Sequence, residues 1–335
     1  MKILLYTDNE KVIGKSGLGK AIKHQMKALE LNNISYTTDP NDEFDILHIN
    51  TYFPASYEFA KKAKENNKKI VYHAHSTEED FRDGFIFCKQ ISPIFKKWII
   101  KCYSLGDVLI TPTLYSKKLL ESYEGLDKKI YAISNGVDID KFQRNEELGI
   151  KFRKKYGFKP TDKVIIGIGL YIRRKGIVDF VELAKKLPNY KFIWFGYSPL
   201  SAATKDVRDA VNTKLDNLTF AGYVEPEMII GAMSGCDLYI FPTLEETEGI
   251  PVIEACACRC KMLIRDIPVF DGWLEDGVNV YKAKDIDEFE NKIIDIIEEK
   301  VPNLTDNAYK IAEERSLANV GKQLKDIYES IYSDD

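Results

Sequence analysis

The sequence has no long apolar segment among its 335 residues. Its longest run, Val164 to Ile172, contains two glycines, whereas a helix that spans a bilayer needs about 20 apolar residues. The opening residues, MKILLYTDNE, turn acidic too early for a secretory signal peptide. Cysteines number only six. We therefore expect a cytoplasmic chain with reduced thiols and without a membrane span.

The sequence also lacks a strong net charge, since 48 Lys and Arg stand against 52 Asp and Glu. This balance argues against a dedicated nucleic-acid binder, and we expect neither a nucleic-acid partner nor an obligate protein partner. Basic residues are in excess up to residue 145 and acidic ones beyond it. That asymmetry permits a basic face on the first half, although uneven scatter explains it equally well.

Short apolar runs alternate with helical patterns along the whole chain. In the first half we expect strands at Lys2–Tyr6, Asp45–Asn50, Lys69–His73, Val108–Thr111 and Lys129–Ile133. In the second half we expect them at Lys163–Gly169, Lys191–Phe195, Leu218–Ala221, Leu238–Phe241 and Met262–Arg265. Helical patterns lie between them, as at Leu18–Leu31, Ala55–Glu65, Ile177–Leu187 and Phe289–Glu299. Continuous apolar strands indicate parallel sheets covered on both faces.

This alternation predicts an α/β protein with two doubly wound, Rossmann-like domains that face a cleft. A length of 335 residues also fits two domains. A polar stretch at 140–147 places the boundary, giving domains at 1–145 and 146–315. The tail shows a helical pattern with no strand after it, so we expect residues 316–335 to pack back on the first domain. Open parallel sheets bind ligands at the carboxyl ends of their strands.

Two carboxylates, Glu246 and Glu254, follow the strand that ends at Phe241. Pro251 suits the first turn of a helix, so Glu254 should lie in that turn, near the unpaired amides of Gly249 and Ile250. A helix start of this kind binds phosphate, and the carboxylates would bind hydroxyl groups. The same pattern fits two glutamates that only complement the helix dipole and cap the helix.

Three further elements follow expected strands. Lys175 and Gly176 end a glycine-containing turn, where a lysine neutralises phosphate. In the first domain, the glycines of Lys15-Ser-Gly17-Leu-Gly19 open a helix that Ser16 would cap. His75, one of only four histidines, follows the strand that ends at His73. A short glycine pattern is common in α/β proteins, and a single histidine can be purely structural.

Taken together, these motifs resemble glycosyltransferase family four in order and spacing. The similarity rests on the Glu-x7-Glu pattern around Gly249-Ile-Pro, on Lys175-Gly176, on Asn135-Gly-Val-Asp138 and on Asp276-Gly-Val-Asn279. The resemblance implies the two-domain GT-B architecture and a retaining hexosyltransferase that uses UDP-glucose or UDP-galactose, without a metal or other cofactor. One departure is Leu170, where the family usually has an arginine. Arg173 and Arg174 are the candidates to supply that charge.

The resemblance also implies residue roles. Glu246 and His75 would be catalytic, with Glu246 on the transferred sugar and His75 on the sugar or the acceptor. Glu254 would bind the ribose of the donor and Lys175 its diphosphate. The implied donor-binding set is Gly17, Gly19, Lys175, Gly249, Ile250 and Glu254.

A basic and aromatic segment lies in the first domain. Ser92 and Pro93 predict a helix start, and the expected membrane-binding residues are Lys89, Lys96, Lys97, Trp98 and Lys101. Basic and aromatic residues on one helix are typical of an interfacial membrane helix, although a core helix with a solvated lysine face has the same pattern.

The segments KSGLGKAIKHQM, His48-Ile-Asn-Thr-Tyr and HAHSTEEDF resemble bacterial diglycosyl-diacylglycerol synthases. This similarity implies an anionic membrane and monoglucosyl-diacylglycerol as partners, and a peripheral location on the inner face of the cell membrane. Two alternatives stay open: the same chemistry on a cell-wall or capsular acceptor, and a non-catalytic protein that binds sugar nucleotides. Finally, Cys256, Cys258 and Cys260 are spaced poorly for one metal on a helix, so we expect small buried side chains.

Overall fold

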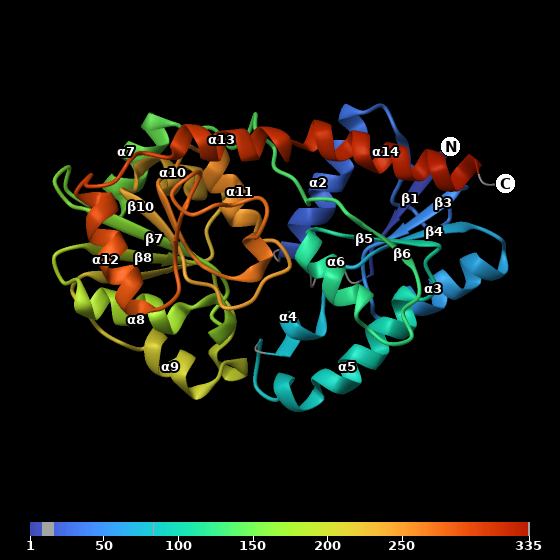
Figure 1. Ribbon diagram of the computed structural model, residues 1–335, viewed down its shortest axis with the longest axis horizontal. Coiled ribbons are helices and arrows are strands. Elements are labelled where there is room, and N and C mark those ends of the chain that lie inside the picture. The colour runs from blue at the N-terminus through green and yellow to red at the C-terminus, as the bar shows by residue number, and fades with distance from the viewer. Residues whose placement is uncertain (9–16, 83, 334–335) are drawn as a thin grey trace. The chain divides into compact units, whose positions relative to one another are not determined.

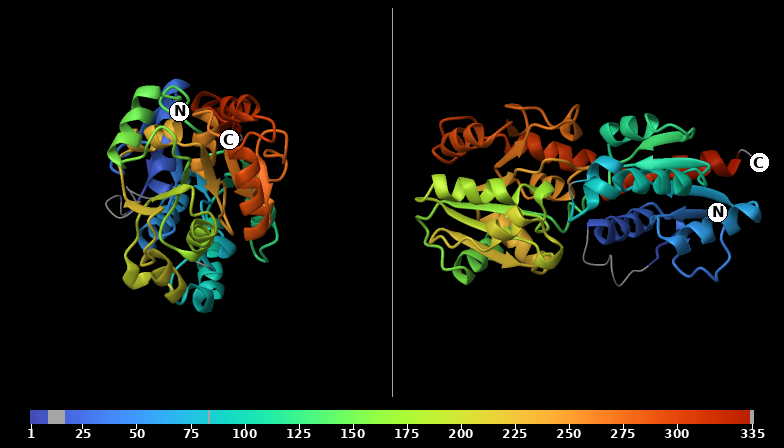
Figure 2. Two further views of the ribbon diagram at one scale, coloured as in Figure 1. Left: turned by 90° about the vertical axis from the view of Figure 1, so that its left-hand side faces the viewer. Right: turned by 90° about the horizontal axis from the view of Figure 1, so that it is seen from below.

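The computed structural model describes residues 1–8, 17–82 and 84–333 (Figure 1). The chain divides into two compact units. The first contains Met1–Phe81, Ile91–Asp138 and Glu314–Asp335, and the second contains Arg82–Gln90 and Ile139–Glu313. The last helix of the chain thus belongs to the first unit, and the short segment 82–90 belongs to the second. Each unit is a parallel sheet with helices on both faces (Figure 2).

The first sheet has the strand order β2-β1-β3-β4-β5-β6. Its strands are β1 (Lys2–Tyr6), β2 (Ser35–Thr37), β3 (Ile46–Ile49), β4 (Lys69–His73), β5 (Val108–Thr111) and β6 (Lys129–Ala132). Its helices are α2 (Gly17–Leu31), α3 (Pro54–Glu65), α4 (Glu78–Arg82), α5 (Cys88–Tyr103), α6 (Leu114–Glu121) and α14 (Leu317–Ser333). One core lies under α2 and α14, and the other lies under α3, α5 and α6.

The second sheet has the strand order β12-β11-β10-β7-β8-β9. Its strands are β7 (Val164–Ile168), β8 (Lys191–Phe195), β9 (Leu218–Gly222), β10 (Leu238–Phe241), β11 (Met262–Arg265) and β12 (Tyr281–Ala283). The α-helices are α7 (Glu146–Lys155), α8 (Ile177–Lys186), α9 (Lys205–Val211), α10 (Pro226–Gly235), α11 (Ile250–Ala257), α12 (Ile286–Ile297) and α13 (Thr305–Glu314). A short 3₁₀ turn, η1 (Arg173–Lys175), precedes α8.

Every strand expected from the sequence is present, and the expected α/β class is confirmed. The short edge strands β2 and β12 were missed, because three residues are too few to show a hydrophobic pattern. The expected start of α5 is wrong. The helix begins at Cys88, Pro93 lies inside it, and the hydroxyl of Ser92 donates to Glu78 at 3.2 Å instead of capping.

The C-terminal pattern forms two helices rather than one. The break lies at Ser316, which pairs with Val137 in an isolated parallel bridge. The amide of Val137 donates to the carbonyl of Arg315 at 3.0 Å, and the amide of Leu317 donates to the carbonyl of Val137 at 3.1 Å. The Asn135–Asp138 segment therefore anchors α14, the red helix that packs beside α2 in Figure 1. None of the helices in the described part of the chain has both the length and the apolarity to cross a bilayer.

Candidate active site

Two loops of the second unit leave the carboxyl ends of β7 and β10, which are neighbours in the sheet. The side chain of Thr243 and the amide of Leu244 both donate to the carbonyl of Arg174, at 3.0 and 2.7 Å. Gly176 has φ of +74°, and a Cβ there would overlap the carbonyl oxygen of Pro242. Only glycine allows this approach, so the two loops are held together by backbone contact.

A buried ion cluster lies where these loops meet. The ammonium group of Lys175 donates to one carboxylate oxygen of Glu246, and Arg174 Nη1 lies 3.5 Å from the other oxygen. Arg174 also donates to the carbonyl of Glu245 at 3.0 Å. Because Glu246 is buried, its charge needs partners of this kind. Two cations thus meet one carboxylate in this cluster.

The structure distinguishes the two arginines that the sequence left open. The side chain of Arg173 is 61% exposed and pairs with Asp206 at 2.8 Å. The side chain of Arg174 is only 11% exposed and lies against Glu246. Arg174 is thus the arginine beside the predicted site, whereas Arg173 belongs to the surface.

Helix α11 begins beside this cluster. Gly249, with φ of +90°, precedes Ile250, the first helical residue. In the described residues we find no acceptor for the amides of Gly249 and Ile250, so these donors remain for an anion. The expected place of Glu254 is wrong. It is the fifth residue of α11 rather than part of its first turn, and it is buried.

Tyr239 on β10 lies close to both glutamates. Burial, together with the charges of Glu254 and Glu246, raises the pKa of its phenol well above the usual value. The phenol therefore stays protonated. No hydrogen-bond partner for it occurs within the described ranges. The sequence analysis missed this residue, although its position on the strand before the Glu-x7-Glu loop could have indicated it.

In the first unit, His75 follows the carboxyl end of β4, and the predicted glycines begin the helix that comes after β1. Gly17 and Gly19 form the first turn of α2, while Lys15 and Ser16 lie outside the described residues. His75 Nε2 is 2.9 Å from Oδ1 of Asn50, and its ring stacks on His73 with centroids 4.0 Å apart. Burial lowers the pKa of His75 to about 3, so the ring is neutral at pH 7.

The predicted membrane-binding residues divide into two groups. Lys89, Lys97 and Lys101 are exposed. Lys96 pairs with Glu78 at 3.3 Å, and the indole of Trp98 donates to the carbonyl of Tyr52 at 2.6 Å.

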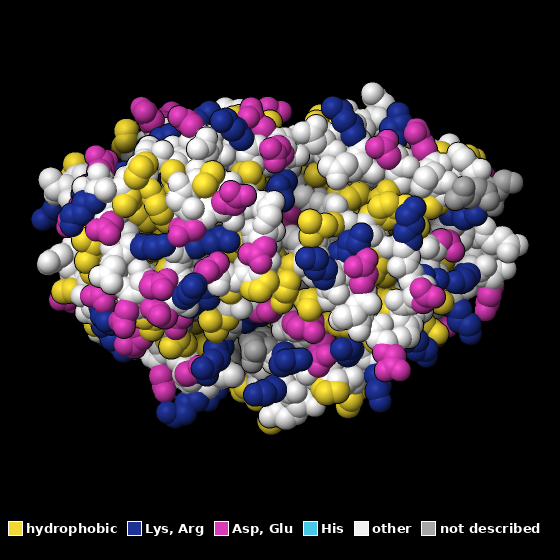
Figure 3. All heavy atoms as spheres, in the orientation of Figure 1, with side chains coloured by type: hydrophobic (Ala, Val, Ile, Leu, Met, Phe, Trp, Pro, Cys, Tyr) yellow, Lys and Arg dark blue, Asp and Glu magenta, His cyan; other side chains and the backbone are white. Residues whose placement is uncertain are grey.

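The sequence analysis did not single out the exposed isoleucines of α5. Ile91 and Ile94 are 45% and 71% exposed, and their spacing places them on one side of α5. Phe87, which is 70% exposed, precedes the helix and belongs to the second unit. Figure 3 shows hydrophobic and basic side chains mixed over α5. We call Ile91, Ile94, Lys97 and Lys101, which all belong to the first unit, the α5 surface.

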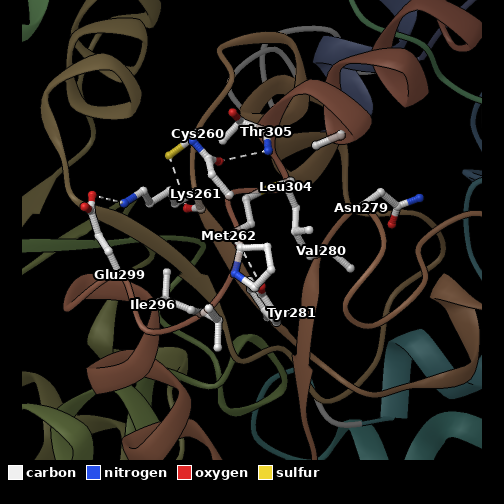
Figure 4. Close-up of a pocket in the computed structure, with 14 residues that line it drawn as sticks. Cys260, Lys261, Met262, Asn279, Val280, Tyr281, Ile296, Glu299, Leu304 and Thr305 are labelled. Atoms are coloured by element: carbon white, nitrogen blue, oxygen red, sulfur yellow. Dashed lines mark hydrogen bonds and ion pairs between the residues drawn. The ribbon is translucent and has the colours of Figure 1, made fainter.

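A hollow of about 390 Å³ occurs elsewhere in the second unit (Figure 4). It is lined by residues such as Met262, Tyr281 and Thr305. Met262 and Tyr281 begin β11 and β12, so the hollow lies at the amino edge of the sheet, away from the Lys175–Glu246 cluster. Cys256, Cys258 and Cys260 form no disulfide in the described part of the chain and are buried, as expected. Across the described residues, no group of His, Cys, Asp or Glu is arranged to hold a metal.

Known proteins with similar sequences match along almost the whole chain. The profile Glycosyltransferase Family 4 matches residues 32–141, and Glycosyl transferases group 1 matches residues 150–315. Processive diacylglycerol alpha-glucosyltransferase of Acholeplasma laidlawii is 40% identical over 99% of this chain and 98% of that protein. Alpha-galactosylglucosyldiacylglycerol synthase of Streptococcus pneumoniae is 23% identical over 82% of this chain and 75% of that protein.

Solved structures share the fold. Anabaena Alr3699/HepE in complex with UDP and glucose has a TM-score of 0.77 at 18% identity, over 98% of this chain and 100% of that chain. Sucrose-phosphate synthase from Thermosynechococcus elongatus has a TM-score of 0.81 at 14% identity, over 100% of both chains. With both units matched by family profiles, and with a full-length relative at 40% identity, this chain belongs to the family 4 glycosyltransferases of the GT-B fold.

Proposed function

We propose that this glycosyltransferase moves glucose or galactose from a UDP-sugar to monoglucosyl-diacylglycerol in a membrane, with retention of the anomeric configuration. The observation that carries the chemistry is the cluster of Lys175, Arg174 and Glu246 beside the free amides of α11. The observation that carries the acceptor is the 40% identity to a protein named as a processive diacylglycerol alpha-glucosyltransferase.

The donor diphosphate binds Lys175 and Arg174, together with the amides of Gly249 and Ile250. It thereby replaces Glu246 as the partner of Lys175, and the released carboxylate accepts hydrogen bonds from hydroxyls of the sugar. Glu254 holds the ribose. These two cations supply positive charge to the leaving group, and we propose that the reaction requires no metal.

In the transfer step, the bond between the anomeric carbon and the UDP oxygen breaks with its electron pair on UDP. The acceptor oxygen bonds to the same face of the sugar, and its proton passes to the departing diphosphate oxygen. Fixed cations that meet the developing negative charge are worth about 10²–10³ in rate each. Neutral His75 accepts a hydrogen bond from a substrate hydroxyl rather than acting as a strong base.

We propose that the α5 surface holds the enzyme on an anionic membrane, on the inner face of the cell membrane. Its exposed isoleucines enter the interface, and its lysines lie at the lipid headgroups. Each such lysine contributes about 1 kcal/mol at an anionic leaflet. A surface of this composition supports a lipid acceptor over a soluble one.

The test is incubation with labelled UDP-glucose or UDP-galactose and one of three acceptors: vesicles with monoglucosyl-diacylglycerol, soluble cell-wall or capsular saccharides, or none. A diglycosyl lipid with UDP release is expected only with the glycolipid vesicles. Formation of product with the soluble saccharides would show that the acceptor is a soluble saccharide and not the proposed glycolipid. Altered sugar nucleotide without any acceptor would indicate an epimerase. Donor binding without UDP release in any mixture would indicate a non-catalytic binding protein.

A further inference from the structure

A chain of hydrogen bonds in the first unit runs from the C-terminal helix to His75. Tyr328 of α14 lies 2.5 Å from Nδ1 of His48. Nε2 of His48 lies 3.1 Å from Nδ1 of His73. The amide nitrogen of Gln25 lies 2.9 Å from the same Nδ1 of His73. All these side chains are buried, so each bond is made away from bulk water.

A second branch connects this chain to His75. The amide nitrogen of Gln25 also donates to Oδ1 of Asn50 at 2.8 Å, and the same oxygen lies 2.9 Å from Nε2 of His75. We call Tyr328, His48, His73, Gln25 and Asn50 the histidine relay. Its members come from β3, β4, α2, α14 and the residue that follows β3.

The buried phenol of Tyr328 sets the direction of the bonds. Burial raises the pKa of this phenol, so it keeps its proton, and His48 Nδ1 is its one hydrogen-bond partner in the described part of the chain. If His48 donated instead, the phenol proton would be buried without an acceptor, which costs about 1–3 kcal/mol. Tyr328 therefore donates, and His48 Nδ1 carries a lone pair.

The positions of the other protons in the network follow from the hydrogen bond that Tyr328 donates. His48 carries its proton on Nε2 and donates it to Nδ1 of His73. Gln25 donates one amide proton to that nitrogen and the other to Asn50, so Oδ1 of Asn50 is an acceptor. His75 must then donate from Nε2, and its lone pair is on Nδ1.

From this geometry we propose that Asn50 and Gln25 are positioning residues, which hold His75 in the tautomer with the proton on Nε2, and that Tyr328 sets the direction of the relay. This proposal rests on the proposed role of His75 as an acceptor of a hydrogen bond from a substrate hydroxyl. That role needs the Nδ1 lone pair, because an Nδ1 proton would turn the acceptor into a donor.

The relay is not arranged for stability alone. Three of its polar atoms are buried without a hydrogen-bond partner in the described residues: Gln25 Oε1, Asn50 Nδ2 and His73 Nε2. Each such atom costs about 1–3 kcal/mol, and apolar side chains in the same place would avoid that cost. A buried polar network that keeps unpaired groups is expected where it fixes the orientation or protonation of a neighbouring functional side chain, here His75.

Nitrogen NMR of the free protein labelled with ¹⁵N-histidine tests the tautomer directly. The chain has only four histidines, so assignment by single substitution is practical. At pH 7 we expect His75 with a protonated Nε2 and a bare Nδ1. A wild-type spectrum with the proton on Nδ1 of His75 would overturn the proposal.

Three variants test the relay itself. Asn50→Ala should leave His75 as a mixture of tautomers, because the acceptor of its Nε2 proton is gone. Tyr328→Phe should also give a mixture, because the direction is no longer set. Asn50→Asp should keep the Nε2 proton, since a carboxylate oxygen still accepts it.

The matched control is Asn32→Ala. Its amide bridges α2 and α14 by donating to the carbonyls of Ala28 and Ala318, at 2.9 and 3.0 Å, but it has no contact with the relay. This variant should keep the wild-type histidine spectrum even if it lowers the melting temperature. Wild-type tautomers in both Asn50→Ala and Tyr328→Phe would show that the relay does not set His75.

Asn50→Asp adds a pH readout. The titratable groups around His75 are His73, stacked on it, with His48 and Tyr328 behind His73. In the described residues no carboxylate is hydrogen-bonded to His75, so the carboxylate that this substitution introduces should raise the pKa of His75. The midpoint of the His75 titration should move up by a pH unit or more. An unchanged midpoint of the His75 titration would contradict the hydrogen bond between residue 50 and His75.

Kinetics complete the test. Asn50→Ala should lower kcat roughly 10- to 100-fold with little change in KM for the sugar nucleotide, and Asn50→Asp should recover part of the loss above the new His75 pKa. An unchanged kcat in Asn50→Ala, with a mixed tautomer by NMR, would overturn the positioning role. The NMR result needs no substrate, so it stands or falls separately from the proposed function.

Discussion

The two units place polar side chains at the same structural position, the carboxyl ends of parallel strands, but with opposite electrostatics. In the second unit, Glu246 is held by Lys175 and Arg174 in a buried ion cluster. In the first unit, His75 is held by a neutral network, and its pKa of about 3 keeps it uncharged. Both sites are partly buried, yet one concentrates charge and the other excludes it.

This difference in charge matches the chemical group that each site is proposed to bind. A departing diphosphate gains negative charge, and fixed cations stabilise that charge in a dry site. A hydroxyl group needs orientation rather than charge, and a neutral ring with one lone pair provides it. The same fold position thus supports two kinds of chemistry, because the fold fixes only where side chains project and not what they are.

The largest effect is expected from the ion cluster. Lys175→Ala and Glu246→Ala should each abolish transfer, with a loss of at least about 10² in kcat. Both variants should remain folded in circular dichroism, since Arg174 still pairs with Glu246 in the first and the two cations left in the second are partly exposed to solvent. The exposed pair Lys185 and Glu182 in the same unit, 2.6 Å apart, is the control, and Lys185→Ala should keep full activity. Near-normal UDP release by either cluster variant would contradict the mechanism.

The contact between the two loops should have the next largest effect, on stability. Gly176→Ala places a methyl group against the carbonyl oxygen of Pro242, so the loops must separate, and we expect a loss above about 3 kcal/mol together with weaker UDP binding. Gly222→Ala is the matched control, because Gly222 has φ of +69° with open space around it. It should cost only about 1–2 kcal/mol for the left-handed backbone. Urea unfolding measures both, and equal losses would argue against a close backbone contact.

A smaller effect is expected in how the stability of each unit depends on pH. Burial lowers the pKa of His48 to about 3 and lowers that of His73 well below 6.5. The unfolded chain therefore binds protons that the folded one does not, so stability is full above about pH 6.5 and falls as the pH drops from there. Each histidine contributes at most about 1.4 kcal/mol per pH unit.

All four histidines belong to the first unit. Hydrogen exchange of its peptides should quicken between pH 7 and pH 5 beyond the intrinsic change, while peptides of the second unit should follow the intrinsic rate. His48→Gln should reduce the difference. Parallel behaviour of the two units would show that the buried histidines do not set this dependence.

The smallest effect is expected at the membrane. Lys97→Ala and Lys101→Ala should each weaken binding to anionic vesicles about fivefold, since one lysine contributes about 1 kcal/mol. Sedimentation with vesicles at low and high salt measures this. Lys185→Ala, in the second unit, should bind as the wild type does. Equal binding by all three variants would remove the α5 surface from the membrane proposal.

Much of this molecule is predictable from local sequence. The apolar strands show their positions directly, and the Glu-x7-Glu and Lys-Gly motifs indicate the loops that we propose to bind the donor, because both features depend on residues close together in the chain. Other features are not local. Arg173 and Arg174 are adjacent, and only the tight turn of η1 decides that one reaches Glu246 and the other reaches Asp206. Likewise, Ser92-Pro93 has the local pattern of a helix start, but in the fold the hydroxyl of Ser92 donates a hydrogen bond to Glu78 instead of capping a helix.

The sequence by itself determined the α/β class, the positions of all strands except β2 and β12, and the loops that carry Lys175, Glu246 and His75. Tertiary structure alone decided which side chains meet: the pairing of Lys175 with Glu246 across 71 positions, and the bond between Tyr328 and His48 across 280. The physical reason is that hydrophobic periodicity specifies which face of each element is buried, whereas a hydrogen bond or an ion pair needs two atoms within about 3 Å, which only the packed fold fixes.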